Sequence, residues 1–357
     1  MKRGYPGKGP DPYLTVVATS RNDDHGGNLL RRMQLFVNGF FAQCERHQLN
    51  AELVLVEWNP PSNRPRLVEA LHWPTGPHSM RIIEVPPEIH RQFRHSERLP
   101  LFQMISKNVG IRRALGQFVL ATNVDILFSD ELVSFLASRR LRKGRIYRAP
   151  RYDVPENMPL NISIDKQLDF CRKNAFRVYL RDGILNLKTG QSYRAHSHMS
   201  FVRRRLGRLL AELLPSSMKR SLHFRLRAGM ARLHTNACGD FTLMAREDWF
   251  RLRGYPQLEM YSLHLDSLLC YMACSAGIRE VVMRYPVYHI EHSGGWTPEV
   301  ERDEGLRKGL SKAEIPQLTS RQLGALAVKM FCERTPTILN LENWGLADRY
   351  LPETRLH

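Results

Sequence analysis

The sequence has few of the features that mark small disulfide-bonded, repeat or membrane-spanning proteins. Its six cysteines are scattered and include no CxxC pair, so neither a disulfide framework nor a zinc ribbon is indicated. Cys270 and Cys274 stand four residues apart beside apolar neighbours, which favours buried thiols over metal ligands. No apolar run approaches the length of a transmembrane helix, and the charged N-terminus lacks the apolar segment of a signal peptide. We therefore expect a cytoplasmic protein that is at most peripheral to a membrane.

Acidic residues are also in short supply. Only 35 of them stand against 53 basic residues, which gives a formal net charge of +18. Such an excess fits phosphates, nucleic acid or an anionic membrane as partners, and also fits a basic surface with no ligand. Nucleic acid is not the favoured partner, because the chain has no zinc-finger spacing and no RNP-like aromatic motif. Hydrophobic residues make up 43% of the chain, which is enough for a sizeable core.

What is present in the first third of the chain is an alternation of strand and helix patterns. Apolar, β-branched strands are expected at 14–19, 52–57, 81–85 and 117–122, with helices at about 28–47 and 102–115. This alternation predicts an α/β fold with a doubly wound, mostly parallel sheet flanked by helices. Ligands of such sheets bind at the carboxyl ends of the strands, where polar residues gather at 20–24, 57–59 and 123–125.

The middle of the chain, about 139–235, is rich in arginine and is interpreted as an insertion. Within it, residues 201–234 form a basic segment with apolar residues at helical spacing. This segment would lie on an anionic membrane near a lipid-linked acceptor, or hold a phosphorylated or acidic glycan, or be a plain solvated helix. His196 and His198 have the spacing of metal ligands, but no third ligand stands near them.

The most informative local feature is a pair of polar residues in an apolar strand. Asn123 and Asp125 interrupt the run 118–128, and residues two apart in an extended chain point to the same side. An amide oxygen and a carboxylate on one side could bind one divalent cation together with a diphosphate. The alternative is an Asx turn that ends the strand.

The surroundings of this pair resemble the GT-A glycosyltransferases, particularly family-2-like members. In that family a helix with the pattern N-x-G-x-x-x-A-x-G leads into the strand that ends in the DxD motif. The run 106–116 matches the pattern at Asn108, Gly110, Ala114 and Gly116. The likeness extends over about residues 12–296, with 130–235 poorly matched. It implies a transferase domain at 13–296, a flexible leader at 1–12 and a helical C-terminal extension at 297–357.

The resemblance also implies roles for single residues. It places a nucleotide-sugar donor against Ser20, Arg21, Asn22, Glu57, Asn108, Arg112, Asn123, Gly239 and Asp240. It implies a divalent metal, Mn²⁺ or Mg²⁺, at Asp125, Asn123 and His292, with His289 as the alternative. The two histidines lie in opposite phases of a strand, or both lie near its end in a loop, and we expect only one of them to face the metal. Asp266, at the start of a helix, matches the catalytic base of the family, and its alternative role is to cap that helix.

The chain departs from the family at three points. The first DxD position is Asn123, and His264 and Leu265 replace the acidic pair before Asp266. The QxxRW motif of processive polysaccharide synthases is absent. The expected function is transfer of a sugar from a nucleotide-diphosphate donor to a glycan or lipid-linked acceptor, with inversion. The alternatives are a basic nucleic-acid- or phosphate-binding protein without transferase activity, and a nucleotidyltransferase or nucleotide-sugar hydrolase on a similar sheet.

Overall fold

The computed structural model describes residues 11–75, 79–194, 233–293 and 314–356. Most of the expected leader, nearly all of the basic segment at 201–234, and the pair His196 and His198 therefore lie outside the described residues. The interpretations attached to these segments stay predictions.

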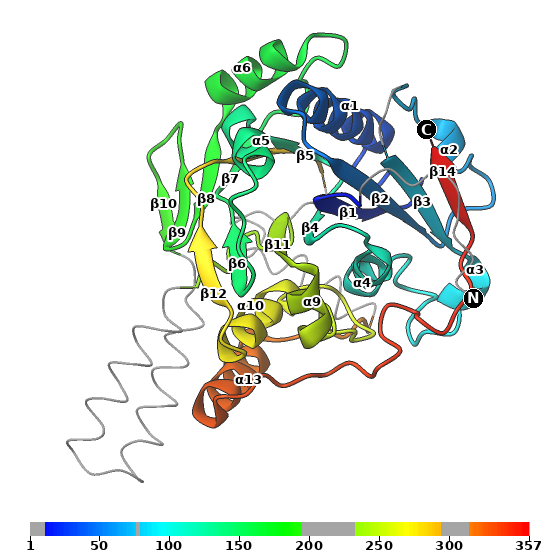
Figure 1. Ribbon diagram of the computed structural model, residues 1–357, viewed down its shortest axis with the longest axis vertical. Coiled ribbons are helices and arrows are strands. Elements are labelled where there is room, and N and C mark those ends of the chain that lie inside the picture. Colours follow the sequence, from blue (N-terminus) through cyan, green and yellow to red (C-terminus); the bar gives the residue numbers. More distant parts are fainter. Residues whose placement is uncertain (1–10, 76–78, 195–232, 294–313, 357) are drawn as a thin grey trace.

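The centre of the protein is an eight-stranded sheet in the order β12-β6-β11-β4-β1-β2-β3-β14 (Figure 1). Four parallel strands form its middle, and they are β1 (Leu14–Ser20), β2 (Ala51–Trp58), β3 (Ser79–Val85) and β4 (Phe118–Thr122). The flanking strands are β6 (Arg145–Arg148), β11 (Phe241–Ala245), β12 (Arg279–Val282) and β14 (Glu353–Leu356). Strand β11 is antiparallel to both β4 and β6, and β14 is antiparallel to β3. The predicted mostly parallel α/β fold is confirmed.

Helices cover both faces of this sheet because its strands are apolar on both sides. In β1, Val16 packs into one core with α1 (Leu29–His47), and Val17 packs into a second core with α4 (Gln103–Arg113). Alternating side chains of a strand point to opposite faces, so a continuous apolar run needs a helix on each side. The other helices are α2 (Leu67–Ala70), α3 (Pro87–His90), α5 (Asp130–Ala137), α6 (Ile164–Asn174), α9 (Arg246–Leu252), α10 (Leu265–Ser275) and α13 (Ser320–Glu333).

A second, six-stranded sheet in the order β10-β9-β8-β7-β13-β5 stands beside the first. Its strands are β5 (Ile126–Phe128), β7 (Arg151–Val154), β8 (Arg177–Leu180), β9 (Gly183–Asn186), β10 (Ser192–Arg194) and β13 (Val287–Ile290). Strand β4 belongs to the large sheet and β5 to the small one, so the chain passes from one sheet to the other within residues 123–125. The two polar residues singled out in the sequence thus lie at the junction of the two sheets.

The C-terminal part, expected from the sequence as a helical extension, contributes the helix α13 and the strand β14 to the domain. Leu323, Ala327 and Met330 of α13 are buried in the same core as α4 and α10. The last strand, β14, forms the edge of the large sheet beside β3. These residues complete the domain, because they cover apolar surface that the preceding chain leaves open.

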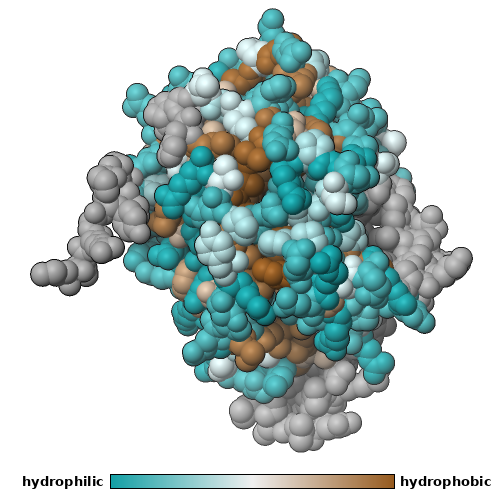
Figure 2. Space-filling view, turned by 90° about the vertical axis from the view of Figure 1, so that its right-hand side faces the viewer, coloured by the Kyte–Doolittle hydropathy of each residue, from teal (hydrophilic) through white to brown (hydrophobic). Residues whose placement is uncertain are grey.

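The described helices include none that is both long and apolar enough to cross a membrane. Figure 2 shows the side of the molecule on which β14 lies. That side is largely hydrophilic, with its apolar residues gathered in several separate areas.

Candidate functional site

The site is built where the end of β13 meets the junction between the two sheets. Strand β13 pairs antiparallel with β5, and this register sets His289 opposite Ile126. The amide of Ile290 donates a hydrogen bond to the carbonyl oxygen of Asp125, at 3.0 Å. The pairing therefore brings the histidines of residues 289–292 next to Asp125, although about 160 residues separate them in the chain.

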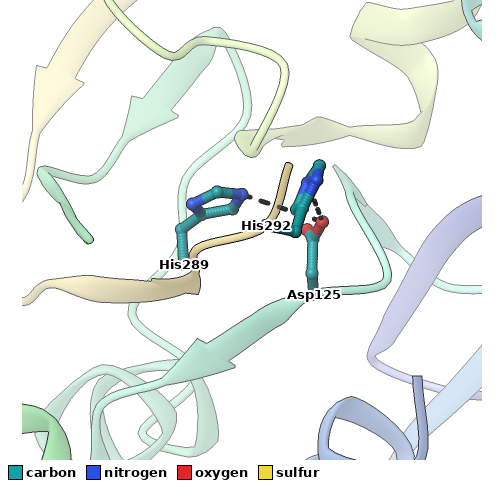
Figure 3. A group of neighbouring side chains, drawn as sticks. All are labelled: Asp125, His289 and His292. Atoms are coloured by element: carbon teal, nitrogen blue, oxygen red, sulfur yellow. Dashed lines mark ion pairs between the residues drawn. The ribbon is translucent and has the colours of Figure 1, made fainter. Parts of the chain in front are cut away.

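Asp125, His289 and His292 form a compact group of metal-ligand atoms (Figure 3). Asp125 Oδ2 lies 3.2 Å from His292 Nε2 and 3.7 Å from His289 Nε2. The three ligand atoms lie within 4.8 Å of one another. Each of the three side chains is at most 10% exposed. This group could hold one metal ion.

The second nitrogen of each imidazole is held by an acceptor. His289 Nδ1 lies 3.1 Å from Asp153 Oδ1, and His292 Nδ1 lies 2.9 Å from the carbonyl oxygen of Ser293. A carbonyl or an ionised carboxylate only accepts, so both Nδ1 atoms carry the proton. In the neutral rings, Nε2 then turns a lone pair towards Asp125. The two Nε2 lone pairs and the carboxylate repel one another, so a proton or a metal cation must lie between them. Histidines that bind a metal are commonly oriented in this way, with the other ring nitrogen donating to an acceptor.

The charges around Asp125 favour its ionised form. Burial alone would raise the pKa of Asp125, but His289, His292 and Arg32 outweigh it and lower the pKa well below the usual value. Burial acts to lower the pKa of His292, and its hydrogen bond to Asp125 more than offsets this and raises it. Asp125 Oδ1 is buried and has no hydrogen-bond partner among the residues that the structure describes. A buried carboxylate oxygen without a partner is costly, and a bound cation would satisfy it, so the residues fit a metal ion.

Two expectations about this metal group need correction. Asn123 does not join it, because its Oδ1 accepts from Lys107 Nζ at 2.7 Å and from Gln103 Nε2 at 3.0 Å. An oxygen that already faces an ammonium is a poor ligand for a second cation. Both histidines face Asp125, where only one was expected to do so. The strand ends at Ile290 and the chain turns, so the alternation of strand side chains no longer applies to His292.

Gly239 and Asp240, two of the predicted donor residues, lie at the end of β4, where Asp240 contacts Asn123. They precede β11, which runs antiparallel to β4 and so begins where β4 ends. The two carboxylate oxygens of Asp240 accept from Asn123 Nδ2 at 2.5 Å and from Arg151 Nη1 at 2.8 Å. Asp240 is thus fixed from both sides at the carboxyl end of the central strands.

Asp266 lies next to Gly239, in the first turn of α10. A side chain at Gly239 would put its Cβ 3.1 Å from Asp266 Oδ2, so the glycine leaves room for this carboxylate. Asp266 Oδ1 accepts a hydrogen bond from the amide of Ser267 at 2.7 Å. This bond leaves Oδ2 towards Gly239. The alternative role of capping the helix does not fit, because the N-cap of α10 is His264 and Asp266 lies inside the first turn.

A third part of the site lies at the ends of β1 and β2, where Ser20 and Glu57 are neighbours in the parallel register. Both oxygens of Glu57 accept from the amide of Leu67, at 3.0 and 3.1 Å. Burial raises the pKa of Glu57 to about 7. Asn22 donates from Nδ2 to the carbonyl oxygen of Pro65 at 2.9 Å, while its buried Oδ1 has no hydrogen-bond partner within the described part of the chain. With Arg21, these residues occupy the sheet edge where the donor was expected.

Asn108 and Arg112 are placed elsewhere, against the expectation that they bind the donor. Asn108 is fully buried and exchanges two hydrogen bonds of 2.8 Å with the backbone of Tyr255. The Arg112 guanidinium lies over the rings of Phe250 and Trp344, at 5.1 and 5.0 Å. It belongs to the last turn of α4, about 13 Å along the axis from the end near Asn123. Both residues hold α4 to neighbouring segments of the fold.

Two charged groups that the structure places in the site were not predicted from the sequence. Lys107 is fully buried between Asn123 and Gly239, and Arg151 joins Asp240 to Asp153 through bonds of 2.8 and 2.7 Å. Asp153 is itself fully buried and orients His289. Lys107 could have been noticed only as a charged residue among the apolar residues on the buried side of α4. Arg151 and Asp153 belong to the small sheet, which the sequence pattern did not resolve.

No protein-family model matches the chain, and no curated protein matches it. Three solved structures with which it shares similarity are a mannosyltransferase, PcManGT from Pyrobaculum calidifontis in complex with GDP-Man and Mn²⁺; TarS residues 1–349 from S. aureus; and the catalytic domain of Drosophila beta1,4-galactosyltransferase 7 in complex with xylobiose. The identities are 12%, 11% and 10%, and the TM-scores are 0.40, 0.40 and 0.33. The matches cover 91%, 90% and 81% of this chain and 74%, 71% and 77% of the others.

Two of these three proteins are sugar transferases by name, which is the class that the sequence resembles. At such low TM-scores the likeness carries nothing about substrate or mechanism. The functional assignment therefore depends on the residues of the site.

Proposed function

We propose that this protein is a metal-dependent glycosyltransferase that moves a sugar from a nucleotide-diphosphate donor to a hydroxyl of a glycan or lipid-linked acceptor. The observation that most supports this proposal is the group Asp125, His289 and His292 at the carboxyl end of the central strands. Two further carboxylates lie at the same edge, since Asp240 contacts Asn123 and Asp266 lies against Gly239. Ligands of doubly wound sheets bind at this edge.

The ligand set favours Mn²⁺ over Mg²⁺ as the metal of this proposal. Two imidazole nitrogens and one carboxylate suit a transition metal, whereas Mg²⁺ prefers a shell of oxygen atoms alone. When bound, such an ion supplies positive charge for the diphosphate leaving group. The protein orients its ligands through Asp153 and the carbonyl oxygen of Ser293.

Asp266 is the proposed base. Its Oδ1 is engaged by the amide of Ser267, so Oδ2 is the oxygen that would take the proton of the acceptor hydroxyl. Asp266 lies in the first turn of α10 and against Gly239, whose carbonyl oxygen accepts from Lys107. A base opposite the leaving group gives inversion at the anomeric carbon, which belongs to the proposal.

An acceptor at the surface of an anionic membrane, and a cytoplasmic location, complete the proposal. The membrane contact is supported by the net charge of +18. The basic segment at 201–234, which would make the membrane contact, lies almost wholly outside the described residues.

The decisive experiment is a thermal-shift screen with UDP-, GDP-, TDP- and CMP-sugars, each with and without Mn²⁺. A ligand at 100 times its dissociation constant stabilises the fold by about 2.7 kcal/mol, which is readily measured. We expect a manganese-dependent rise in melting temperature with one nucleotide. The Asp125→Asn variant should lose the rise, whereas Asp130→Asn, which alters an Asp–His pair outside the site, should keep it. No rise with any nucleotide sugar would favour a basic phosphate- or nucleic-acid-binding protein.

A further inference from the structure

A buried lysine lies beneath the site, at a position where an apolar side chain would have filled the core. Lys107 has no exposed surface, and its Nζ lies 2.7 Å from Asn123 Oδ1 and 2.8 Å from the carbonyl oxygen of Gly239. Both of these acceptors are neutral. Moving an ammonium into the interior costs several kcal/mol, so packing alone is a poor reason for a lysine here.

The charge of Lys107 is balanced by the carboxylates of the site. Burial lowers the pKa of Lys107 to about 8, and Asp240, Asp266 and Asp125 act against this lowering, in that order of strength. At neutral pH the side chain is therefore mostly a cation that faces three carboxylates. These carboxylates come from different elements of the fold, namely the start of β11, the start of α10 and the junction between the sheets.

Lys107 fixes the orientation of the Asn123 amide. An ammonium only donates, so Asn123 must present its oxygen to Lys107 and its NH₂ group to the other side. That NH₂ group donates to Asp240 Oδ1 at 2.5 Å. The lysine thus acts on Asp240 through Asn123, and the amide orientation follows from its partners.

The second acceptor of Lys107 connects it to the proposed base. The carbonyl oxygen of Gly239 accepts from Lys107, and the same glycine lies against Asp266 Oδ2. A displacement of Gly239 would change the space next to that carboxylate oxygen. One ammonium therefore connects the segment that carries Asp125 to the segment that lies against Asp266.

We propose that Lys107 is a positioning residue for sugar transfer, holding Asn123 and Gly239 together and so setting the distance between the metal ligands and the carboxylates of Asp240 and Asp266. This inference rests on the proposed function, because it takes the roles of the metal ligands and of Asp266 from it. Lys107 does not touch the substrate. It acts through the two groups that its ammonium holds.

The test compares three variants of α4. Lys107→Met removes the ammonium at similar length, and Lys107→Arg keeps a cation. Asn108→Ala is the matched control, because Asn108 is the next residue of the same helix, is equally buried, and also makes two hydrogen bonds, but with Tyr255. Each variant is assayed for backbone hydrogen exchange, for Mn²⁺ affinity, and for kcat and KM with the donor found in the thermal-shift screen.

For Lys107→Met we expect faster exchange at residues 122–125 and 237–241. We also expect a loss of kcat on the order of 100-fold, as for a reacting group displaced by about 1 Å, with little change in the donor KM or the Mn²⁺ affinity. Lys107→Arg should recover part of the kcat. Asn108→Ala should instead speed exchange around residues 254–257 and leave the kcat of the folded enzyme unchanged.

Unchanged exchange at both segments in Lys107→Met would overturn the proposal, and so would an equal loss of kcat in Asn108→Ala. If Lys107→Met does not fold, Asn123→Ala breaks the same contact from the other side and should loosen residues 237–241. Failure of the proposed function is distinguishable, because it would show as no turnover by the wild-type protein with any donor. The exchange measurement would then still decide whether Lys107 holds the two segments together.

Discussion

Replacing Glu57 by glutamine should stabilise the protein in a manner that depends on pH. Glu57 is 1% exposed, and burial raises its pKa from 4.5 to about 7. Between these two values the folded state binds more protons than the unfolded state, so the free energy of unfolding falls as the pH rises through this window. Ionised Glu57 therefore destabilises the fold above about pH 7 and has little effect below about pH 4.5.

The magnitude follows from the size of the shift. Each pKa unit corresponds to about 1.4 kcal/mol, so the whole penalty approaches roughly 3 kcal/mol at high pH. Between pH 5 and pH 8, glutamine should gain about 2.5 kcal/mol relative to glutamate. Glutamine also makes a different hydrogen bond with the amide of Leu67, but its strength does not depend on pH. It therefore cancels when the effect of the substitution at pH 5 is subtracted from the effect at pH 8.

Urea unfolding of the wild type and of Glu57→Gln at pH 5 and pH 8 measures this difference directly. Glu84→Gln is the control, because Glu84 is the register neighbour of Glu57 on β3 and its side chain is 24% exposed. If Glu57→Gln gains no more at pH 8 than at pH 5, the carboxyl is not held in its protonated form by burial, and the reasoning is wrong.

Three further outcomes are expected. Asp125→Ala should remove metal-stimulated donor binding in a calorimetric titration, and unaltered binding would contradict the metal assignment. Asp266→Asn should keep donor affinity near normal while turnover is lost, so retained turnover would point to another base. Asn123→Asp restores the family's DxD pattern but sets a second carboxylate against Asp240 Oδ1, in place of an NH₂ group 2.5 Å away. Because this substitution leaves buried polar groups without suitable partners, it should lower the free energy of unfolding by about 1–3 kcal/mol, measured with urea. It should not tighten Mn²⁺ binding. Tighter binding would show that position 123 can supply a metal ligand.

The large sheet was predictable because its strands carry local signals. The β-branched run at 14–19 and the apolar run at 52–57 each lie within a strand of the structure. The small sheet was not resolved, since its strands are three or four residues long and its strand β13 pairs with β5 and β7 across more than a hundred residues of chain. Short strands whose partners are distant carry little periodicity of their own.

In the candidate site, too, features set by neighbouring residues in the sequence were predicted, and features set by distant segments were not. Asp125 was identified from its spacing within one strand. The arrangement of His289 and His292 depends on where β13 ends, and Lys107 depends on which face of α4 meets the junction of the sheets. Asn108 and Arg112 were misplaced because a motif shared with a family says nothing about which way a side chain points from its helix.

The edge strand β14 has a consequence for the biosynthesis of the protein. It pairs with β3, and Arg81 bonds Glu353 across 272 residues of chain. During translation the β3 edge therefore stays without its partner until nearly all of the described chain has been made. Unpaired strand edges invite association with other chains, so the nascent protein should depend on chaperones that shield this edge until β14 emerges from the ribosome.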